Sequence, residues 1–391
     1  MNFTFTQRHK LIAITLMVVG VLGIVLGAIN APELEGGVKD MTRTWASLLL
    51  GNFFFMVIAL AGLAFVSIQY VAEVGWSAII KRIPLAMSTY IPFAAAFMFI
   101  IFIFGHKDIY SWSAGVLDHH LSKKAAFLNV TSFSIRMFIY FVIWISFAFF
   151  IRKNALAEDE IGGTSMYMKN RKFAAAFLVL YLVSSSMMAW DFIMSIDPYW
   201  FSTLFGWYVF ASGWVSGLSM IGLIVVFLKR QGLLPGLKES HLHDIGKFMF
   251  GFSVFWTYLW FVQMMLMWFA DLPEEVAYFI PRFTTYRPLF LLNFAVNFIT
   301  PFLVLMTRDA KRKISIVATA AIIILVGHWL DVYLMIMPGT VGSNYYFGWS
   351  EIGATAFFGG LFMFVVMRNL AASPLIAKNH PMLQEALNHS I

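Results

Sequence analysis

The amino-acid sequence predicts an all-α integral membrane protein with ten transmembrane helices. Of its 391 residues, 60% are hydrophobic and only 12% are charged, which is far outside the range of a soluble domain. Apolar windows of about 20 residues, the length that crosses about 30 Å of hydrocarbon, recur along the whole chain. The polar segments between them are short. The sequence therefore leaves no room for a soluble domain.

The ten predicted helices follow one another in order along the chain, each justified by an apolar window long enough to span a bilayer. They cover residues 11–29, 44–70, 83–105, 129–151, 173–194, 202–228, 244–269, 288–306, 314–337 and 350–369. We treat residues 1–391 as one integral membrane domain, in which residues 370–391 form a tail.

A faint internal repeat suggests how the helices group. Asp191 precedes Pro198, and Asp331 precedes Pro338, by the same seven residues in the fifth and ninth helices. These helices run in the same direction because they are four spans apart. The repeat predicts two like-oriented four-helix bundles, helices two to five (residues 44–194) and helices six to nine (residues 202–337), with the first and tenth helices outside them.

The basic residues predict the orientation. An even number of spans places both termini on one side of the membrane. The N-terminus, alternate loops and the tail carry 18 of the 27 Lys and Arg residues. The opposite loops carry seven, namely Lys39, Arg43, Lys107, Lys123, Lys124, Arg282 and Arg287, while Arg136 and Lys247 lie within helices. By the positive-inside rule, both termini are predicted to be cytoplasmic.

The absence of cysteine limits the cofactors that this chain can hold. Iron–sulfur clusters need thiolates, and c-type haem needs a Cys-x-x-Cys-His motif. Only His328 lies well inside a predicted span, with His106 at a helix end, so a b-type haem with two histidine ligands is not expected either. We expect this chain to bind no redox cofactor and no metal. In redox chemistry, electrons would pass through other subunits or a mobile quinone.

Five ionisable side chains fall in the outer half of the predicted spans. They are Arg136, Asp191, His328, Asp331 and Glu351. A charged side chain near the bilayer centre costs about 2.5–3.5 kcal/mol on insertion scales, so each is a candidate functional residue. The inner half lacks a carboxylate or a histidine well inside a span. The sequence therefore favours an outer proton half-channel over a path across the whole membrane.

Helical spacing places several of these residues on continuous faces. One face of the fourth helix carries Ser132, Arg136, Tyr140 and Trp144, and one face of the fifth carries Ser184, Met188, Asp191 and Ser195. His328 and Asp331 are three residues apart and therefore neighbours on the ninth helix, where such a pair can pass protons. Arg136, Tyr140, Asp191, His328, Asp331 and Glu351 are thus proton-relay candidates.

Each pattern also has a purely structural interpretation. Arg136 could pair with Asp191 or Asp331 only to hold helices together. Asn293 and Asn297 are predicted to make hydrogen bonds between helices. The Gly23-x3-Gly27 and Gly213-x3-Gly217 pairs are predicted to allow close helix packing. Tryptophans near helix ends are interpreted as an interfacial belt, namely Trp45, Trp76, Trp112, Trp200 and Trp349. The net charge of +7 follows from topology and anionic lipids, so no nucleic-acid partner is expected.

The stretch WDFIMSIDPYWFSTLFGWYVFASGWVSG (190–217) resembles the NrfD/polysulfide-reductase family of membrane-anchor subunits. It is most similar to the smaller of the two such subunits of bacterial alternative complex III, a quinol:cytochrome c or quinol:oxidase oxidoreductase. The larger sister subunit carries an Asp-Phe-x-x-Ser-x-x-Pro-x-Trp pattern. The matching residues here are Asp191, Phe192, Ser195, Pro198 and Trp200. Phe201 stands where the sister has a histidine, which argues against an independent quinol-oxidising site.

The resemblance implies a place in a respiratory assembly of the bacterial inner membrane. Expected partners are a sister NrfD-like subunit, an iron–sulfur subunit and haem c subunits, with a terminal oxidase as a further candidate, together with lipids. It implies a structural role and a periplasm-facing proton half-channel, with Asp191 as its terminal proton group and Asp331 and His328 as the equivalent in the second bundle.

Two alternatives stay open at this point. The chain could bind menaquinone or another quinone itself, near Arg136, Asp191 and Trp200. It could also be a secondary transporter, since polar groups within a helix bundle are common in transporters.

Overall fold

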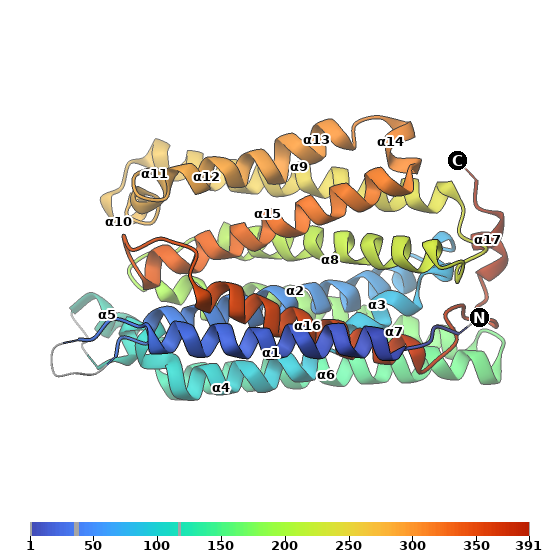
Figure 1. Ribbon diagram of the computed structural model, residues 1–391, viewed down its shortest axis with the longest axis horizontal. Helices are drawn as coiled ribbons and strands as arrows, with labels where there is room; N and C mark the ends of the chain where they lie inside the picture. Colours follow the sequence, from blue (N-terminus) through green and yellow to red (C-terminus); the bar gives the residue numbers. More distant parts are fainter. Residues whose placement is uncertain (1, 35–38, 116–118, 391) are drawn as a thin grey trace.

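The computed structural model describes residues 2–34, 39–115 and 119–390. Ten helical segments within these ranges are long and apolar enough to cross a membrane, which confirms the predicted number of spans. The segments run side by side along the long axis of the molecule (Figure 1). Both termini lie at one end, which we call the termini end. The loops around α5, α10 and α11 mark the opposite end.

The spans fall close to their predicted windows. They comprise α1 (Gln7–Ile29), α2 (Thr42–Val71), α3 (Arg82–Ser88) with α4 (Ile91–Ile109), α6 (Val130–Ile161), α7 (Ser165–Phe192) with η3 (Met194–Ile196), α8 (Leu204–Arg230), α9 (Glu239–Ala270), α12 (Arg287–Phe294) with η4 (Ala295–Ile299) and α13 (Thr300–Val304), α15 (Ile314–Thr340) and α16 (Trp349–Ala371). The short helices are η1 (Trp76–Ile79), η2 (Ser111–Ser113), α5 (His119–Lys124), α10 (Pro273–Val276), α11 (Ile280–Phe283), α14 (Arg308–Arg312) and α17 (Leu383–Asn388).

Proline explains where two spans are interrupted. The third span breaks between Ser88 at the end of α3 and Ile91 at the start of α4, and Pro92 has no N–H to donate to the carbonyl of Ser88. The eighth span widens into the π-helical turn η4 immediately before Pro301. Because proline has no backbone N–H, it cannot donate to the preceding turn, and the hydrogen-bond ladder shifts there.

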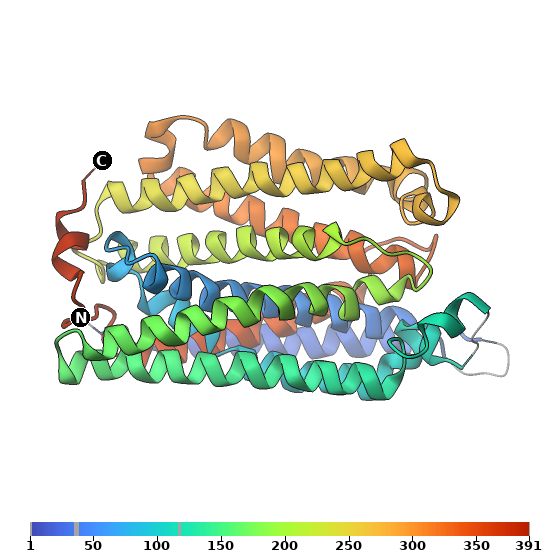
Figure 2. The same ribbon diagram turned by 180° about the vertical axis from the view of Figure 1, so that it is seen from behind.

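Helix α2 lies at the centre of the molecule. It packs against α4, α7, α8 and α16, while α6 pairs with α7 and α8 with α9 and α15. The view from behind shows α6 and α7 side by side along one face (Figure 2). These contacts join helices within each predicted group of four and also join α2 of one group to α8 of the other. The division into two like-oriented bundles therefore stays a prediction.

The glycine pairs pack helices closely, as predicted. The first and tenth spans, α1 and α16, pair with each other, and a Cβ atom added to Gly23 would lie 2.8 Å from the Cα atom of Gly353. A Cβ atom added to Gly217 of α8 would lie 2.3 Å from that of Ala61 on α2. Any larger residue at either position would push the helices apart.

The C-terminal segment packs across the termini end. His241 Nε2 lies 3.0 Å from the carbonyl oxygen of Ala386, and His389 Nε2 lies 2.6 Å from Asp244 Oδ2, which joins the tail to the start of α9. At its other end Asn379 donates to the carbonyl of Asp159 on α6 at 2.8 Å. The predicted tail is therefore a docked part of the fold.

Candidate functional site

Two aspartates are fully buried inside the helix bundle. Asp191 lies in the last turn of α7, and Asp331 lies in α15, about 14 Å from the helix end at Thr340. Each residue as a whole is 0% exposed. Both lie nearer to the end opposite the termini. Neither faces the lipid, so each depends on protein groups for its polar contacts.

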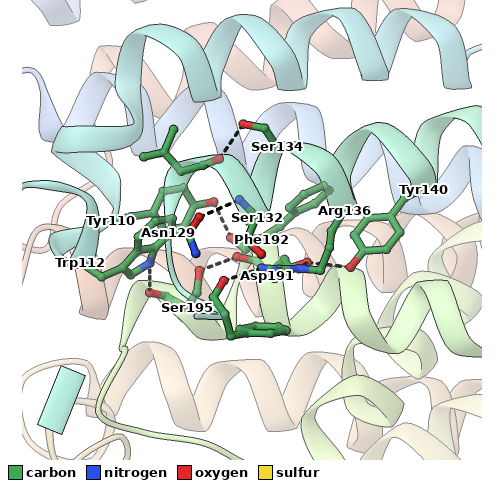
Figure 3. A network of polar contacts seen from close by, with 12 residues as sticks. Tyr110, Trp112, Asn129, Ser132, Ser134, Arg136, Tyr140, Asp191, Phe192 and Ser195 are labelled. Carbon is green, nitrogen blue, oxygen red and sulfur yellow. Dashed lines mark hydrogen bonds and ion pairs between the residues drawn. The ribbon is translucent and has the colours of Figure 1, made fainter. Parts of the chain in front are cut away.

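Asp191 is held by a cation and a phenol from the neighbouring helix α6 (Figure 3). Arg136 donates from Nε to Oδ2 at 2.9 Å and from Nη2 to Oδ1 at 2.7 Å, which is a two-pronged ion pair. Tyr140 donates to Oδ2 at 2.7 Å. The guanidinium also donates to the carbonyl of Phe127 at 3.0 Å and lies 3.8 Å from its ring centre. Of the two partners proposed for Arg136, the structure selects Asp191.

The two residue faces predicted on α6 and α7 meet each other. About two turns from the ion pair toward the termini end, Trp144 of α6 donates to Ser184 of α7 at 2.9 Å. At the end of α7, where carbonyls lack helical partners, Tyr110 donates to the carbonyl of Phe192 at 2.9 Å, and Trp112 donates to that of Ser195 at 3.1 Å (Figure 3). The expectation that Trp112 belongs to an interfacial belt is wrong, because its side chain is buried and works as a helix cap.

Asp331 is held by neutral donors from three other spans. Tyr208 of α8 makes a short hydrogen bond to Oδ1, which also accepts from Asn293 of α12 at 2.9 Å. Trp256 of α9 donates to Oδ2 at 3.0 Å. The interhelical role predicted for Asn293 is confirmed, whereas Asn297 donates to Asn293 along the same span at 2.6 Å. Within the described residues, no Lys or Arg forms an ion pair with Asp331.

His328 is the neighbour of Asp331 that its spacing predicted. Its Nδ1 atom lies 3.7 Å from Asp331 Oδ2 and 3.1 Å from the hydroxyl oxygen of Ser212. Its ring packs edge-on against Trp256, with 5.3 Å between ring centres. The other ring nitrogen, Nε2, is buried and has no hydrogen-bond partner in the described part of the chain. One imidazole nitrogen is thus available for a proton or a water molecule.

A small cavity adjoins the Asp331 site on the side away from the termini. Two of the donors to Asp331, Tyr208 and Asn293, form part of its wall. Other polar residues in the wall are Gln263, Tyr278 and Arg282. Its volume is about 20 Å³, enough for one water molecule, which needs about 10–15 Å³. A water there would connect the Asp331 donors to the loop between α9 and α12.

Arg282 lines this cavity and donates to carbonyls inside α15. Pro338 lacks the N–H that would donate to the carbonyl of Leu334, and Arg282 Nε donates to that carbonyl instead at 3.1 Å. The guanidinium also lies 3.4 Å from the ring centre of Tyr278 and bonds to its carbonyl. The proline that marked the sequence repeat therefore creates the acceptor that positions this buried cation.

Asp197 lies just after the fifth span and is partly exposed. Its carboxylate oxygens face Gly339, where an added Cβ atom would lie 2.9 Å from Oδ2. Burial raises the pKa of the Asp197 carboxyl above its usual range, and the nearby Arg282 charge acts in the opposite direction. Asp197 thus lies against α15, close enough to Arg282 for the two charges to interact.

The two remaining predicted residues lie outside both aspartate sites. Glu351 begins α16, where its Oε2 accepts from the N–H of Gly348 at 2.9 Å and its Oε1 pairs with Arg43 of α2 at 2.7 Å. This is a helix cap and an interhelical tie. Trp200 stacks on Tyr278 with 3.8 Å between ring centres and contacts Met267. The structure thus joins Arg136 and Tyr140 to Asp191 but places Trp200 beside the second site.

A third polar cluster, which sequence analysis did not find, lies at the termini end. Helix α6 continues ten residues past its predicted end, to Ile161, and carries Glu158 into the protein. Glu158 pairs with Lys81 at 2.7 Å and accepts from Tyr70 at 2.6 Å. Burial lowers the pKa of Lys81 to about 8, although the Glu158 carboxylate opposes this shift. The windows predicted at 129–151 and 173–194 assigned Glu158 to the loop between them, so this carboxylate was not among the predicted site residues.

Within the described residues, no group of three His, Cys, Asp or Glu side chains is close enough to hold a metal ion. No protein-family model matches the chain, and a search among well-characterised proteins finds no similar sequence. The site's chemistry must therefore be argued from its own geometry. Buried carboxylates, phenols and an imidazole can transfer protons between neighbouring hydrogen-bonded atoms.

Proposed function

We propose that this chain is an integral membrane subunit of a quinol-oxidising respiratory complex of the alternative complex III type, and that it gives protons a route between Asp331 and the periplasmic side. The proposed setting is the bacterial inner membrane, with cytoplasmic termini and two like-oriented helix bundles. The subunit needs no redox cofactor of its own. Haem c and iron–sulfur clusters would belong to its partners.

One observation carries the proton role. Asp331 is buried among neutral donors, and two of these donors also line a water-sized cavity whose wall includes Arg282. A carboxylate without a fixed cation can gain and lose a proton at lower cost than one held in a two-pronged ion pair. His328, whose Nε2 has no hydrogen-bond partner among the described residues, extends the set of proton-binding atoms inward.

The ion pair of Asp191 and Arg136 supports a different role within the same proposal. Its two hydrogen bonds hold α6 and α7 in register next to the α7 end. Trp200, the third member of the quinone site considered from the sequence, lies against Tyr278. These features favour pinning over quinone binding at Asp191.

Purification tests the place in a complex. The tagged full-length chain, extracted from its native membrane in a mild detergent, is expected to co-elute with haem-bearing chains that stain for peroxidase activity. A chain that elutes alone, or only with copies of itself, would contradict the subunit proposal and would favour a transporter. The proton role is tested in that purified complex by the Asp331 variant described in the Discussion.

A further inference from the structure

A wide groove opens on the outside of the helix bundle, near the termini end. It lies where α6 passes the junction of α3 and α4 and the end of α16, and its volume is about 530 Å³. Thr89 and Pro92 line one side, Asn369 lies at the end, and Ile145 and Phe149 form the wall on α6. The groove is far from both aspartate sites and plays no part in the proposed proton route.

The helix break produces this groove. The chain leaves α3 at Ser88, and the hydroxyls of Ser88 and Thr89 turn back to the carbonyls of Leu85 and Ala86, at 2.8 and 2.6 Å. The axis of the third span is therefore displaced where α4 begins. On α6, which faces this break, the small side chain of Ala148 fills little of the space. The outer wall stays open, because the Phe149 side chain is 59% exposed.

Two cationic side chains that form no ion pair with a described residue, Arg152 and Lys153, line the groove. Arg152 donates from Nη1 to Asn369 Oδ1 at 2.7 Å, and the Asn369 amide is oriented by its own bond to the carbonyl of Val365 at 2.8 Å. Lys153 is exposed beside it. In the described parts of the chain neither cation forms an ion pair, since the nearby acids Glu158 and Asp159 already pair with Lys81 and Arg82.

The depth of these cations matches a lipid headgroup. Arg152 lies about 33 Å along α6 from its start at Val130, by the rise of an α-helix. The hydrocarbon core is about 30 Å thick, so Arg152 and Lys153 reach the headgroup level while Ile145 and Phe149 remain at the level of acyl chains. An anionic head and an apolar chain are therefore both accommodated, in the order in which a phospholipid presents them.

We propose that this groove binds one anionic phospholipid, with its phosphate between Arg152 and Lys153 and one acyl chain along Ile145, Ala148 and Phe149. The guanidinium keeps its charge at all physiological pH values and is already aligned by Asn369, so little ordering is needed when the phosphate arrives. The bound lipid would fill the gap left by the α3–α4 break.

Photo-crosslinking tests this proposal. The full-length chain is placed in phosphatidylcholine vesicles that contain a trace of phosphatidylglycerol with a diazirine in its acyl chain, and labelled peptides are mapped. We expect labelling of the 145–156 segment about fivefold or more above that given by a phosphatidylcholine probe with the same chain, since each cation near the surface contributes about fivefold. Equal labelling by the two probes would overturn the proposal.

Two variants and a matched control locate the site. The double variant Arg152→Gln, Lys153→Gln should reduce labelling by phosphatidylglycerol to the level of phosphatidylcholine. Ala148→Trp, which fills the groove without changing charge, should reduce labelling by both probes. The control Lys169→Gln, Lys172→Gln removes the same charge from exposed positions on α7 at the same end. An equal loss of labelling in this control, or undiminished labelling in Ala148→Trp, would contradict the proposal.

Discussion

Asp191 and Asp331 occupy matching places in the sequence, seven residues before a proline in spans that run in the same direction, yet their charges are stabilised in different ways. Asp191 is bound by the full charge of Arg136 and by one phenol, all from the adjacent helix α6. Asp331 accepts from a phenol, an indole and an amide that come from three other spans.

Asp191 is therefore held in one charged arrangement, whereas the hydrogen bonds around Asp331 can rearrange. A two-pronged ion pair resists protonation and holds two helices together, while neutral donors can reorient when a carboxyl group gains a proton. The prolines differ as well. Pro198 lies in the turn after η3, whereas Pro338 lies inside α15 and leaves a carbonyl that Arg282 caps. The same sequence spacing thus precedes a carboxylate fixed by an ion pair in one half of the molecule and, in the other, the carboxylate to which we assign the proposed proton role.

The largest expected effect tests the clamp, that is, the ion pair of Arg136 and Asp191 that joins α6 to α7. Arg136→Met leaves the buried Asp191 with Tyr140 alone, and an uncompensated buried charge of this kind costs about 3–5 kcal/mol of unfolding free energy. Thermal unfolding in detergent measures the loss. Combining Arg136→Met with Asp191→Leu should recover most of it, and Lys123→Met, at an exposed position, is the control. A melting curve of Arg136→Met like that of the unmodified protein would refute the clamp.

The second prediction tests the Asp331 site. Asp331→Asn removes the proton acceptor but keeps the size of the side chain, so the complex should assemble while quinol-linked proton release falls by about 100-fold. The exposed Asp309→Asn on α14 should leave proton release unchanged. Proton release is followed with a pH indicator in proteoliposomes. Unchanged release in an assembled Asp331→Asn complex would end the proton role and leave the subunit assignment intact.

The two tyrosines sharpen the comparison. Tyr140→Phe and Tyr208→Phe each remove one phenol from a buried carboxylate, so each should cost about 1–3 kcal/mol of stability. Only Tyr208→Phe should also slow proton release, because only Tyr208 lines the cavity. Parallel measurements of melting temperature and proton release distinguish the outcomes. An equal slowing by both substitutions would mean that the two sites do not differ in proton access.

The smallest effect concerns Asp197 at the outer end of the second site. Burial raises its pKa in the folded protein, so as pH rises the unfolded chain loses this proton first. The folded state then holds more protons, and stability falls as pH increases from about 4 through the folded pKa. Asp197→Asn should flatten this slope and change stability at neutral pH by no more than about 0.5 kcal/mol. Melting curves between pH 4 and 7 test it, and a steeper slope would contradict the assignment.

Residue spacing predicted local neighbours but not the full sites. The one-turn spacing of His328 and Asp331 and the common face of Arg136 and Tyr140 follow from helix geometry, and both are found in the structure. By contrast, Tyr208 and Asp331 are 123 residues apart and appear ordinary in the sequence. Nothing in the local pattern of Tyr208 or Trp256 distinguishes a donor to a carboxylate from an interfacial aromatic residue.

The sequence by itself determined the ten spans, the placement of both termini at one end, and the positions along the helices where charged groups enter the bundle. These properties are one-dimensional, because bilayer thickness sets the length of each apolar window. Only the tertiary structure decided which groups contact each carboxylate, that Trp112 donates to a carbonyl beyond the end of α7 and Arg282 to one inside α15, and that Glu158 is buried. Hydrogen bonds between spans depend on how helices rotate and pack against each other, and the small residues and helix breaks that set this packing act together across distant parts of the chain.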